Sequence, residues 1–317
     1  MVNFVNLDGK NVLRKLGLLV GVAACGALVV SCGGGGSDSE PEPTDTSTAT
    51  PTPTPTTAVD FSLTTAIEAT STNTGLIYAF FTPTGGAETF SDSSRLPGTA
   101  SISLKFAPES ATFAFPDLSD AAVFAGSTLS SASATQRVYT DGNRSLTLQR
   151  PFSQSLRAIY QIGGQAFTQG TTAGTLRSQR VALFFNTVTT TTAIANTLSY
   201  TGTPQAVGGT PGTTPAGIIT SPAVTLTVSA GTTNTLTGTI NLFQTINGTT
   251  TQVGAFPISA TVGANGAFAG TIDDNTYNLD GNFAGALAGA NRDELVLLFS
   301  VANTTDKREY VGTLIGD

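Results

Sequence analysis

The sequence predicts an all-β protein, in which a C-terminal antiparallel up-and-down β-barrel of about eight strands follows a second β-rich region. A disordered N-terminal tether precedes both. Charged residues make up only 11% of the chain, His and Trp are absent, and Thr, Ser, Gly and Ala dominate. Short apolar or alternating runs are separated by turn residues every eight to twelve positions or so, which is typical of sandwiches and barrels. No long amphipathic helix is present in the pattern.

The first 31 residues resemble a bacterial lipoprotein signal peptide. Three basic residues precede an apolar run from 16 to 30, which is shorter than the ~20 residues of a membrane-spanning helix. The run ends in Leu-Val-Val-Ser-Cys, so that Cys32 follows a small residue, as a lipidated cysteine does. Its thiol would take a diacylglycerol, and cleavage would free its amine for a further acyl chain such as palmitate. Several acyl chains make a stable anchor.

Cys25 fits the same loose pattern but leaves a shorter apolar run before it and is followed by more apolar residues. The sequence therefore favours Cys32 and leaves Cys25 as the alternative. A non-cleaved membrane helix and a Cys25–Cys32 disulfide are the other interpretations of this segment.

Residues 32–58 contain the cysteine and a tether rich in Gly, Pro and Thr, whose alternating Thr-Pro favours extended conformations. Gly33 in place of Asp after the cysteine predicts sorting to the outer membrane. Removal of residues 1–31 takes away three basic residues and one acidic residue, which changes the formal net charge from −7 to −9. Nucleic acid is therefore not expected as a partner.

The remaining chain divides into an N-terminal β-rich region (59–190) and the barrel (191–317). Asp141-Gly142-Asn143 predicts a hairpin turn between the strand runs 136–140 and 144–150. The runs that predict strands are 75–82, 100–107, 111–115, 135–140, 157–163, 176–186, 223–229, 236–244, 252–262, 266–272, 293–301 and 308–316. The aromatic runs among them are interpreted as core strands whose two faces are covered by the barrel and flanking loops.

A glycine is paired with an apolar residue two positions later at five places in the C-terminal part. Such pairs face one side of a strand and suit a barrel interior, where small and large side chains alternate. The segment 279–300 belongs to this pattern and is interpreted as two paired strands, with the turn at Gly-Ala-Asn-Arg-Asp-Glu. The pairs are Gly238-x-Ile240, Gly254-x-Phe256, Gly266-x-Phe268, Gly281-x-Phe283 and Gly312-x-Leu314.

Residues 180–317 resemble the β-barrel domain of the transferrin-binding protein B-like surface lipoproteins, a group that includes factor H binding protein. Gly289, Glu294, Leu295 and Phe299 fall at the offsets of that family's glycine-rich signature, with Leu287 in place of its first aromatic residue. Further similar strands are 198–202, 236–240 and 312–316. The resemblance implies a barrel on a lipidated tether that binds its ligand through variable loops and N-terminal regions, and it carries over no ligand-contacting residue.

The departures from the signature are Ala290, Arg292 and the pair Val296-Leu297, which replace its Pro, Ala and Gly-Gly.

Few residues suit catalysis or metal binding. With no His and no Cys beyond the leader, nucleophile–base pairs and transition-metal sites lack their groups, and no cofactor is expected. Lys105 and Lys307 are outside any Ser-x-x-Lys context. Paired carboxylates stay possible only through the fold, and surface carboxylates are the favoured interpretation. Residues 273–281 match a calcium loop only partly and predict a polar turn, as do the Asn-x-Ser/Thr triplets at 143, 247 and 303.

One segment, from 121 to 200, is locally basic, with six arginines and a single acid, Asp141. It offers a candidate face for an anionic ligand, made of Arg137, Arg144, Arg150, Arg177 and Arg180, with Arg157 as the sixth arginine of the segment. The alternative is that these arginines are merely the polar, solvent-facing residues of strands.

The leading functional hypothesis is a monomeric, non-enzymatic, outer-membrane-anchored surface lipoprotein that binds a host or environmental protein or a small solute through barrel-rim and N-terminal loops. A structural or adhesive surface lipoprotein without a discrete ligand is the alternative. A surface hydrolase is the least favoured hypothesis.

Overall fold

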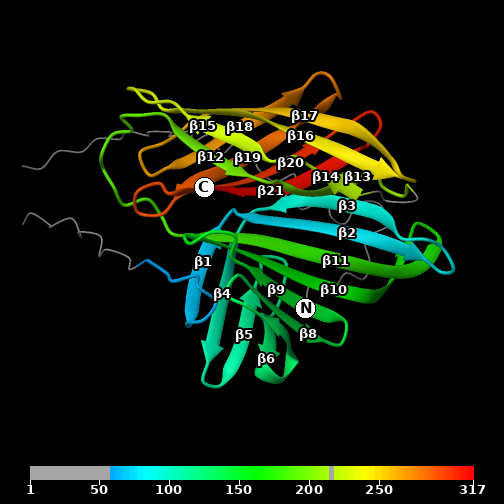
Figure 1. Cartoon of the computed structure of the whole chain (residues 1–317). Helices are drawn as coiled ribbons and strands as arrows, with labels where there is room; N and C mark the ends of the chain where they lie inside the picture. The colour runs from blue at the N-terminus through cyan, green and yellow to red at the C-terminus, as the bar shows by residue number, and fades with distance from the viewer. Residues whose placement is uncertain (1–57, 214–217) are drawn as a thin grey trace, which may run out of the picture.

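The computed structural model describes residues 58–213 and 218–317, and their regular structure is antiparallel β throughout (Figure 1). The helical element among these residues is a short 3-10 turn, η1 (Gly126–Thr128). The all-β prediction is thus confirmed. The predicted leader, Cys32 and nearly all of the tether lie outside the described residues.

The N-terminal half forms a four-stranded sheet, in the order β1-β4-β5-β6, and a seven-stranded sheet, in the order β3-β2-β11-β10-β9-β8-β7. The strands of the first are β1 (Ile67–Thr72), β4 (Thr99–Phe106), β5 (Glu109–Ala114) and β6 (Ala122–Ala125). The strands of the second are β2 (Gly75–Pro83), β3 (Thr89–Leu96), β7 (Leu129–Ala132), β8 (Gln136–Asp141), β9 (Arg144–Gln149), β10 (Ser155–Gln169) and β11 (Thr172–Phe185).

The C-terminal half forms two further sheets, β12-β15-β16-β14 with β17 paired to β16, and β13-β21-β20-β19-β18. The predicted division at residue 190 falls in the connection between β11 and β12. The strands are β12 (Leu198–Gly202), β13 (Gln205–Gly209), β14 (Ile218–Thr220), β15 (Val224–Val228), β16 (Thr235–Ile246), β17 (Thr249–Thr261), β18 (Ala267–Asp274), β19 (Leu279–Ala288), β20 (Glu294–Ala302) and β21 (Glu309–Gly316).

These two C-terminal sheets surround one hydrophobic core and meet at both edges. At one edge, the main chains of Thr201 and Asp317 exchange two hydrogen bonds, of 2.8 and 3.3 Å. At the other edge, β17 leads directly into β18, and the carboxylate of Asp274 accepts a hydrogen bond of 2.7 Å from the Ala255 N–H. The predicted C-terminal barrel thus corresponds to β12 and β15 to β21 arranged around a common interior.

The sheet that contains β2, β10 and β11 is buried on both faces. Ile77 and Ala182 face the core shared with the four-stranded sheet. Their neighbours Leu76 and Val181 face the opposite way and pack with Val311 of β21. Figure 1 shows the same order, with β20 and β21 above this sheet and β1, β4, β5 and β6 below it. The aromatic runs are therefore covered by a sheet on each side together with a flanking segment, because Phe61 and Leu63, which precede β1, belong to the same core as Phe184.

The five apolar members of the glycine pairs are all buried in the C-terminal core, as predicted. The structure adds a more specific role for the neighbouring glycines. Phe283 lies opposite Gly270 on the paired strand, and Phe299 lies opposite Gly312. A Cβ added at Gly270 would stand 2.6 Å from Phe283 Cζ, and one added at Gly312 would stand 2.5 Å from Phe299 Cζ. Each glycine therefore leaves room for a phenyl ring that crosses to the next strand.

Segment 279–300 forms β19, a turn and β20, as predicted. Gly289 adopts φ +83°, which suits glycine, and its carbonyl accepts a hydrogen bond of 3.1 Å from the Arg292 N–H. The hairpin predicted at 141–143 is also present, with Asp141 opposite Arg144.

Six strands were not predicted by the run analysis: β1, β3, β6, β7, β13 and β14. β3 illustrates why. Its buried positions include Thr89 and Ser93, so that its inward face lacks the apolar alternation by which strands are recognised.

Replacement of Gly312 by alanine tests the ring–glycine contact. The added Cβ would lie 2.5 Å from Phe299 Cζ and 2.7 Å from the Gln205 carbonyl oxygen, so ring and backbone would both have to move. We expect Gly312→Ala to lower the free energy of unfolding by about 2 kcal/mol or more, measured by chemical denaturation.

Gly163 provides the matched control, because the nearest heavy atom to its added Cβ would be 3.7 Å away. Gly163→Ala should change the free energy of unfolding by less than about 1 kcal/mol. Equal losses in the two variants would show that the ring contact is not the cause.

Candidate functional site

Two arginines of the predicted basic face are buried in ion pairs of the N-terminal half. The Arg180 guanidinium, 4% exposed, donates to both carboxylate oxygens of Asp117 at 2.6–3.0 Å. Arg137 pairs with Glu109 and also donates to the Leu63 carbonyl oxygen at 3.0 Å. Their charges are neutralised inside the fold, so neither offers a free cation.

Arg177 and Arg144 form more accessible ion pairs. Arg177 binds Glu88 through two hydrogen bonds of 2.9 and 2.7 Å and lies 4.2 Å from the centre of the Phe80 ring. Arg144 pairs with Asp141 at the hairpin turn. Aromatic stacking and a carboxylate partner together satisfy the Arg177 guanidinium.

Arg150, just after β9, donates its main-chain N–H to the Thr135 carbonyl oxygen at 2.8 Å. Four of the five predicted arginines are thus held by four different carboxylates, and the structure does not bring the five together into one free cationic face. The physical reason is that the predicted excess of positive charge considered only the acids within residues 121–200. Three of the partner carboxylates lie before that segment, namely Glu88, Glu109 and Asp117. Strand pairing and sheet packing bring them to the arginines.

Arg157, the sixth arginine of the segment, has a different environment. It lies on β10 between Leu156 and Ala158, which face the N-terminal core, and it points to the opposite side, toward the C-terminal half. The side chain is 4% exposed, yet its Nε has no hydrogen-bond partner and Nη1 reaches only the Gln149 side-chain oxygen, at 3.4 Å. Within residues 58–213 and 218–317, Arg157 forms no ion pair.

The loss of water around this guanidinium lowers the pKa of Arg157 to about 10. The neighbouring Tyr78 phenol, whose own pKa burial raises to about 12, offsets this effect only in part. At neutral pH the phenol is uncharged, and it donates a 2.5 Å hydrogen bond to Gln179. Among the described residues, Arg157 is therefore a buried charged group without an ion-pair partner.

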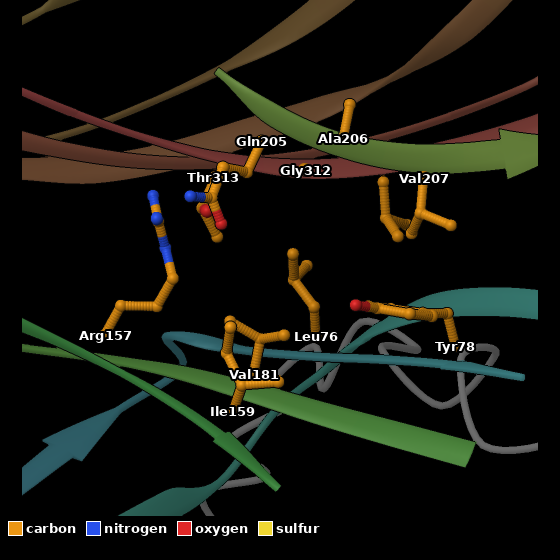
Figure 2. A pocket seen from close by; sticks show the side chains of 11 residues that line it. Leu76, Tyr78, Arg157, Ile159, Val181, Gln205, Ala206, Val207, Gly312 and Thr313 are labelled. Carbon is orange, nitrogen blue, oxygen red and sulfur yellow. The ribbon is translucent and has the colours of Figure 1, made fainter. Parts of the chain in front are cut away.

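Arg157 borders a cavity of about 170 Å³ between the seven-stranded sheet and β13 and β21. We call this the seam cavity. Figure 2 shows the Arg157 guanidinium directed toward Gln205 and Thr313, while the Tyr78 hydroxyl enters from the other side. The floor and roof are mainly apolar. They are formed by Leu76, Ile159 and Val181 on one side and by Ala206, Val207, Val311 and Gly312 on the other.

A second, more open hollow of about 410 Å³ adjoins the seam cavity and shares Arg157 and Gln205 with it. Its other lining residues are Pro151, Phe152, Thr201, Gly202, Thr203, Ala223 and Ile315. Arg157 thus stands between an apolar recess and a wider space with a partly polar wall.

Sequence reasoning counted Arg157 within the basic segment but did not select it as a site residue. A signal was present: Arg157 opens the largely apolar predicted strand 157–163 and directly follows Leu156. A charge at such a position has to face either a partner or a ligand.

Other candidate motifs are turns, as predicted. In segment 273–281, Asp274 accepts hydrogen bonds from the N–H groups of Thr276 and Tyr277, at 3.1 and 3.2 Å, which closes the β18–β19 turn. In the part of the chain that the structure describes, no group of three or more His, Cys, Asp or Glu is placed to hold a metal ion. Within the same residues, no helix has the length and apolar character needed to cross a membrane.

Comparison with known proteins finds similarity in structure only. No protein-family model matches the chain, and no curated protein matches it. Transferrin-binding protein B from serogroup B Neisseria meningitidis is similar at 13% identity and a TM-score of 0.36, over 76% of this chain and 43% of that one.

A protein described as a surface lipoprotein is similar at 10% identity and a TM-score of 0.38, over 78% of this chain and 100% of that one. A mutant transferrin-binding protein B from Haemophilus parasuis Hp5 has 10% identity and a TM-score of 0.33, over 76% and 58% of the two chains. The chain thus spans less than half of the meningococcal protein. These likenesses concern the arrangement of strands and do not show that the chain belongs to the family.

Replacement of Arg157 by methionine tests whether its charge is uncompensated. Because burial disfavours the charged form, we expect Arg157→Met to raise the free energy of unfolding at pH 7 by roughly 1–3 kcal/mol. Chemical denaturation of the purified protein measures this change.

Arg180→Met is the matched control, because it removes an equally buried arginine and leaves Asp117 without its partner. That variant should lose about 3–5 kcal/mol. If Arg157→Met loses stability in the same way, then Arg157 has a structural partner and its charge is compensated.

Proposed function

We propose that this protein is a lipid-anchored, non-enzymatic binding protein of the bacterial outer membrane, which binds a protein or a small solute from the cell's surroundings. The observation that carries the proposal is the order of parts in the sequence. A basic and apolar leader ends at Cys32, a Gly/Pro/Thr-rich tether follows, and then comes a β body. Such an order serves to hold a folded domain at a membrane surface.

The packing of the β body supports a binding role for the folded part. Two halves meet through a buried seam, so loops and hollows at their junction are held by strands on both sides. Ligand sites occur preferentially at such domain interfaces. The seam cavity favours a small solute over a protein ligand, because its volume is only about 170 Å³.

Substitution of Cys32 tests the anchor. In cells supplied with labelled palmitate, we expect the full-length protein to be labelled and found in the outer-membrane fraction. Cys32→Ala should abolish the label, because no thiol would then stand at the acceptor position.

Cys25→Ala is the control and should keep the label. Labelling that persists in Cys32→Ala and disappears in Cys25→Ala would move the anchor to Cys25. Labelling that persists in both single variants and also in the Cys25→Ala, Cys32→Ala double variant would disprove lipidation at these cysteines.

Binding and adhesion are separated by a second experiment. The full-length protein, purified in a neutral detergent and immobilised, should retain a component of the growth medium or of serum in a saturable manner. An adhesive protein without a discrete ligand would retain none, and deletion of its gene would lower attachment of the cells to surfaces. Reduced attachment together with no saturable partner would overturn the binding proposal in favour of adhesion.

A further inference from the structure

We propose that the seam cavity binds a small carboxylic acid, whose carboxylate pairs with Arg157 and whose apolar body fills the recess beside it. This inference rests on the small-solute form of the proposed function and names the class of solute.

The charge of Arg157 is the first argument. A guanidinium that is 4% exposed, with an Nε lacking any partner and no carboxylate in ion-pair contact among the described residues, is a costly group to bury. Its planar fork matches the two oxygens of a carboxylate, which can accept two parallel hydrogen bonds. A bound carboxylate would supply the countercharge that the residues in the described part of the chain do not provide there.

The number of charges selects the kind of anion. Arg157 is the cationic residue in the lining of both hollows, and the other polar lining groups near it, Gln205 and Thr313, are neutral. One positive charge compensates a monoanion such as a carboxylate. A phosphate monoester, which carries nearly two negative charges at neutral pH, would leave one of them uncompensated in a site shielded from water.

The apolar lining selects the rest of the molecule. Five of the lining residues, Leu76, Ile159, Val181, Val207 and Val311, have hydrocarbon side chains. Its volume of about 170 Å³ is close to that of an engineered apolar cavity of ~150 Å³ that accommodates benzene. The body of the ligand should therefore be of about six carbon atoms, either a ring or a short chain.

The adjoining hollow of about 410 Å³ explains how the carboxylate and the apolar body of the ligand are oriented. It shares Arg157 and Gln205 with the recess, so the guanidinium stands at the junction of the two spaces. A ligand that enters from the larger space would place its apolar body in the recess and its carboxylate at the junction, where neutral hydrogen-bonding groups are also available.

Calorimetric titration of the full-length protein in dodecyl maltoside tests the proposal with benzoate as the probe. We expect saturable binding with one site per chain. Benzamide, which has the same shape without the charge, should bind at least about tenfold more weakly. In the series from acetate to hexanoate, each added methylene should strengthen binding by up to about fourfold until the recess is full.

Three variants assign the site. Arg157→Met should weaken benzoate binding at least about tenfold, and Arg157→Lys, which keeps the charge but not the fork, should weaken it several-fold. Val181→Phe should block the recess and leave Arg157 in place. Arg144→Met, which removes a basic residue from the hairpin turn, should bind benzoate like the unmodified protein.

Several outcomes would overturn the inference. These are no saturation with benzoate up to about 10 mM, equal binding of benzamide, sulfate binding as tightly as benzoate, or benzoate binding unchanged in Arg157→Met and Val181→Phe. If Arg157→Met does not fold, Arg157→Lys and Val181→Phe still test whether benzoate binds at Arg157 and in the recess. Loss of benzoate binding alongside intact palmitate labelling and a saturable partner would reject this inference alone, whereas unlabelled protein that binds benzoate would reject only the anchor.

Discussion

The structure depends on one sheet that is buried on both of its faces. Along β2, Leu76 and Ile77 point to opposite sides, and both are almost fully covered. A strand of this kind requires apolar residues at consecutive positions, which explains the apolar runs in β2 and β11 and the one that follows Arg157 in β10. It also requires a second layer on each side, so neither half of the molecule could leave the other without exposing this apolar surface to water.

Polar groups trapped at this seam must find partners there. Glu294, 2% exposed at the start of β20, accepts hydrogen bonds from the Gln154 N–H at 2.6 Å and the Ser155 hydroxyl at 2.7 Å. Its carboxylate therefore fastens the C-terminal half to the segment that enters β10. On β10, two positions after Ser155, Arg157 faces the same seam without a comparable partner. The Glu294 carboxylate is thus satisfied within the protein, whereas no described carboxylate pairs with Arg157, and this contrast is the reason to regard Arg157 as a ligand group.

The local sequence was sufficient to predict the turns and the buried strand positions, because these features depend on residues that are close together in the chain. The hairpin at 141–143, the turn at Gly289 and the burial of the apolar residue in each glycine pair follow from turn chemistry and strand period. The fate of the arginines depends on residues distant in sequence: Arg180 meets Asp117 and Arg177 meets Glu88 only because β11 lies against distant segments. Counting charges within one segment therefore could not show that Arg150 and Arg157 would be the arginines of that segment without an ion pair among the described residues.

The position of Arg157 also links stability to binding. A charge buried without a partner weakens the packing of the two halves, and an anion that pairs with it would favour the packed form by mass action. The seam would thus be tightened by the ligand that it encloses, without any hinge or lid. Because Arg157 belongs to β10 and the opposite wall belongs to β13 and β21, a ligand in the cavity contacts both halves at once. Binding and cohesion of the two halves are then the same physical event, which gives a reason for a fold to keep an otherwise unfavourable buried charge at its centre.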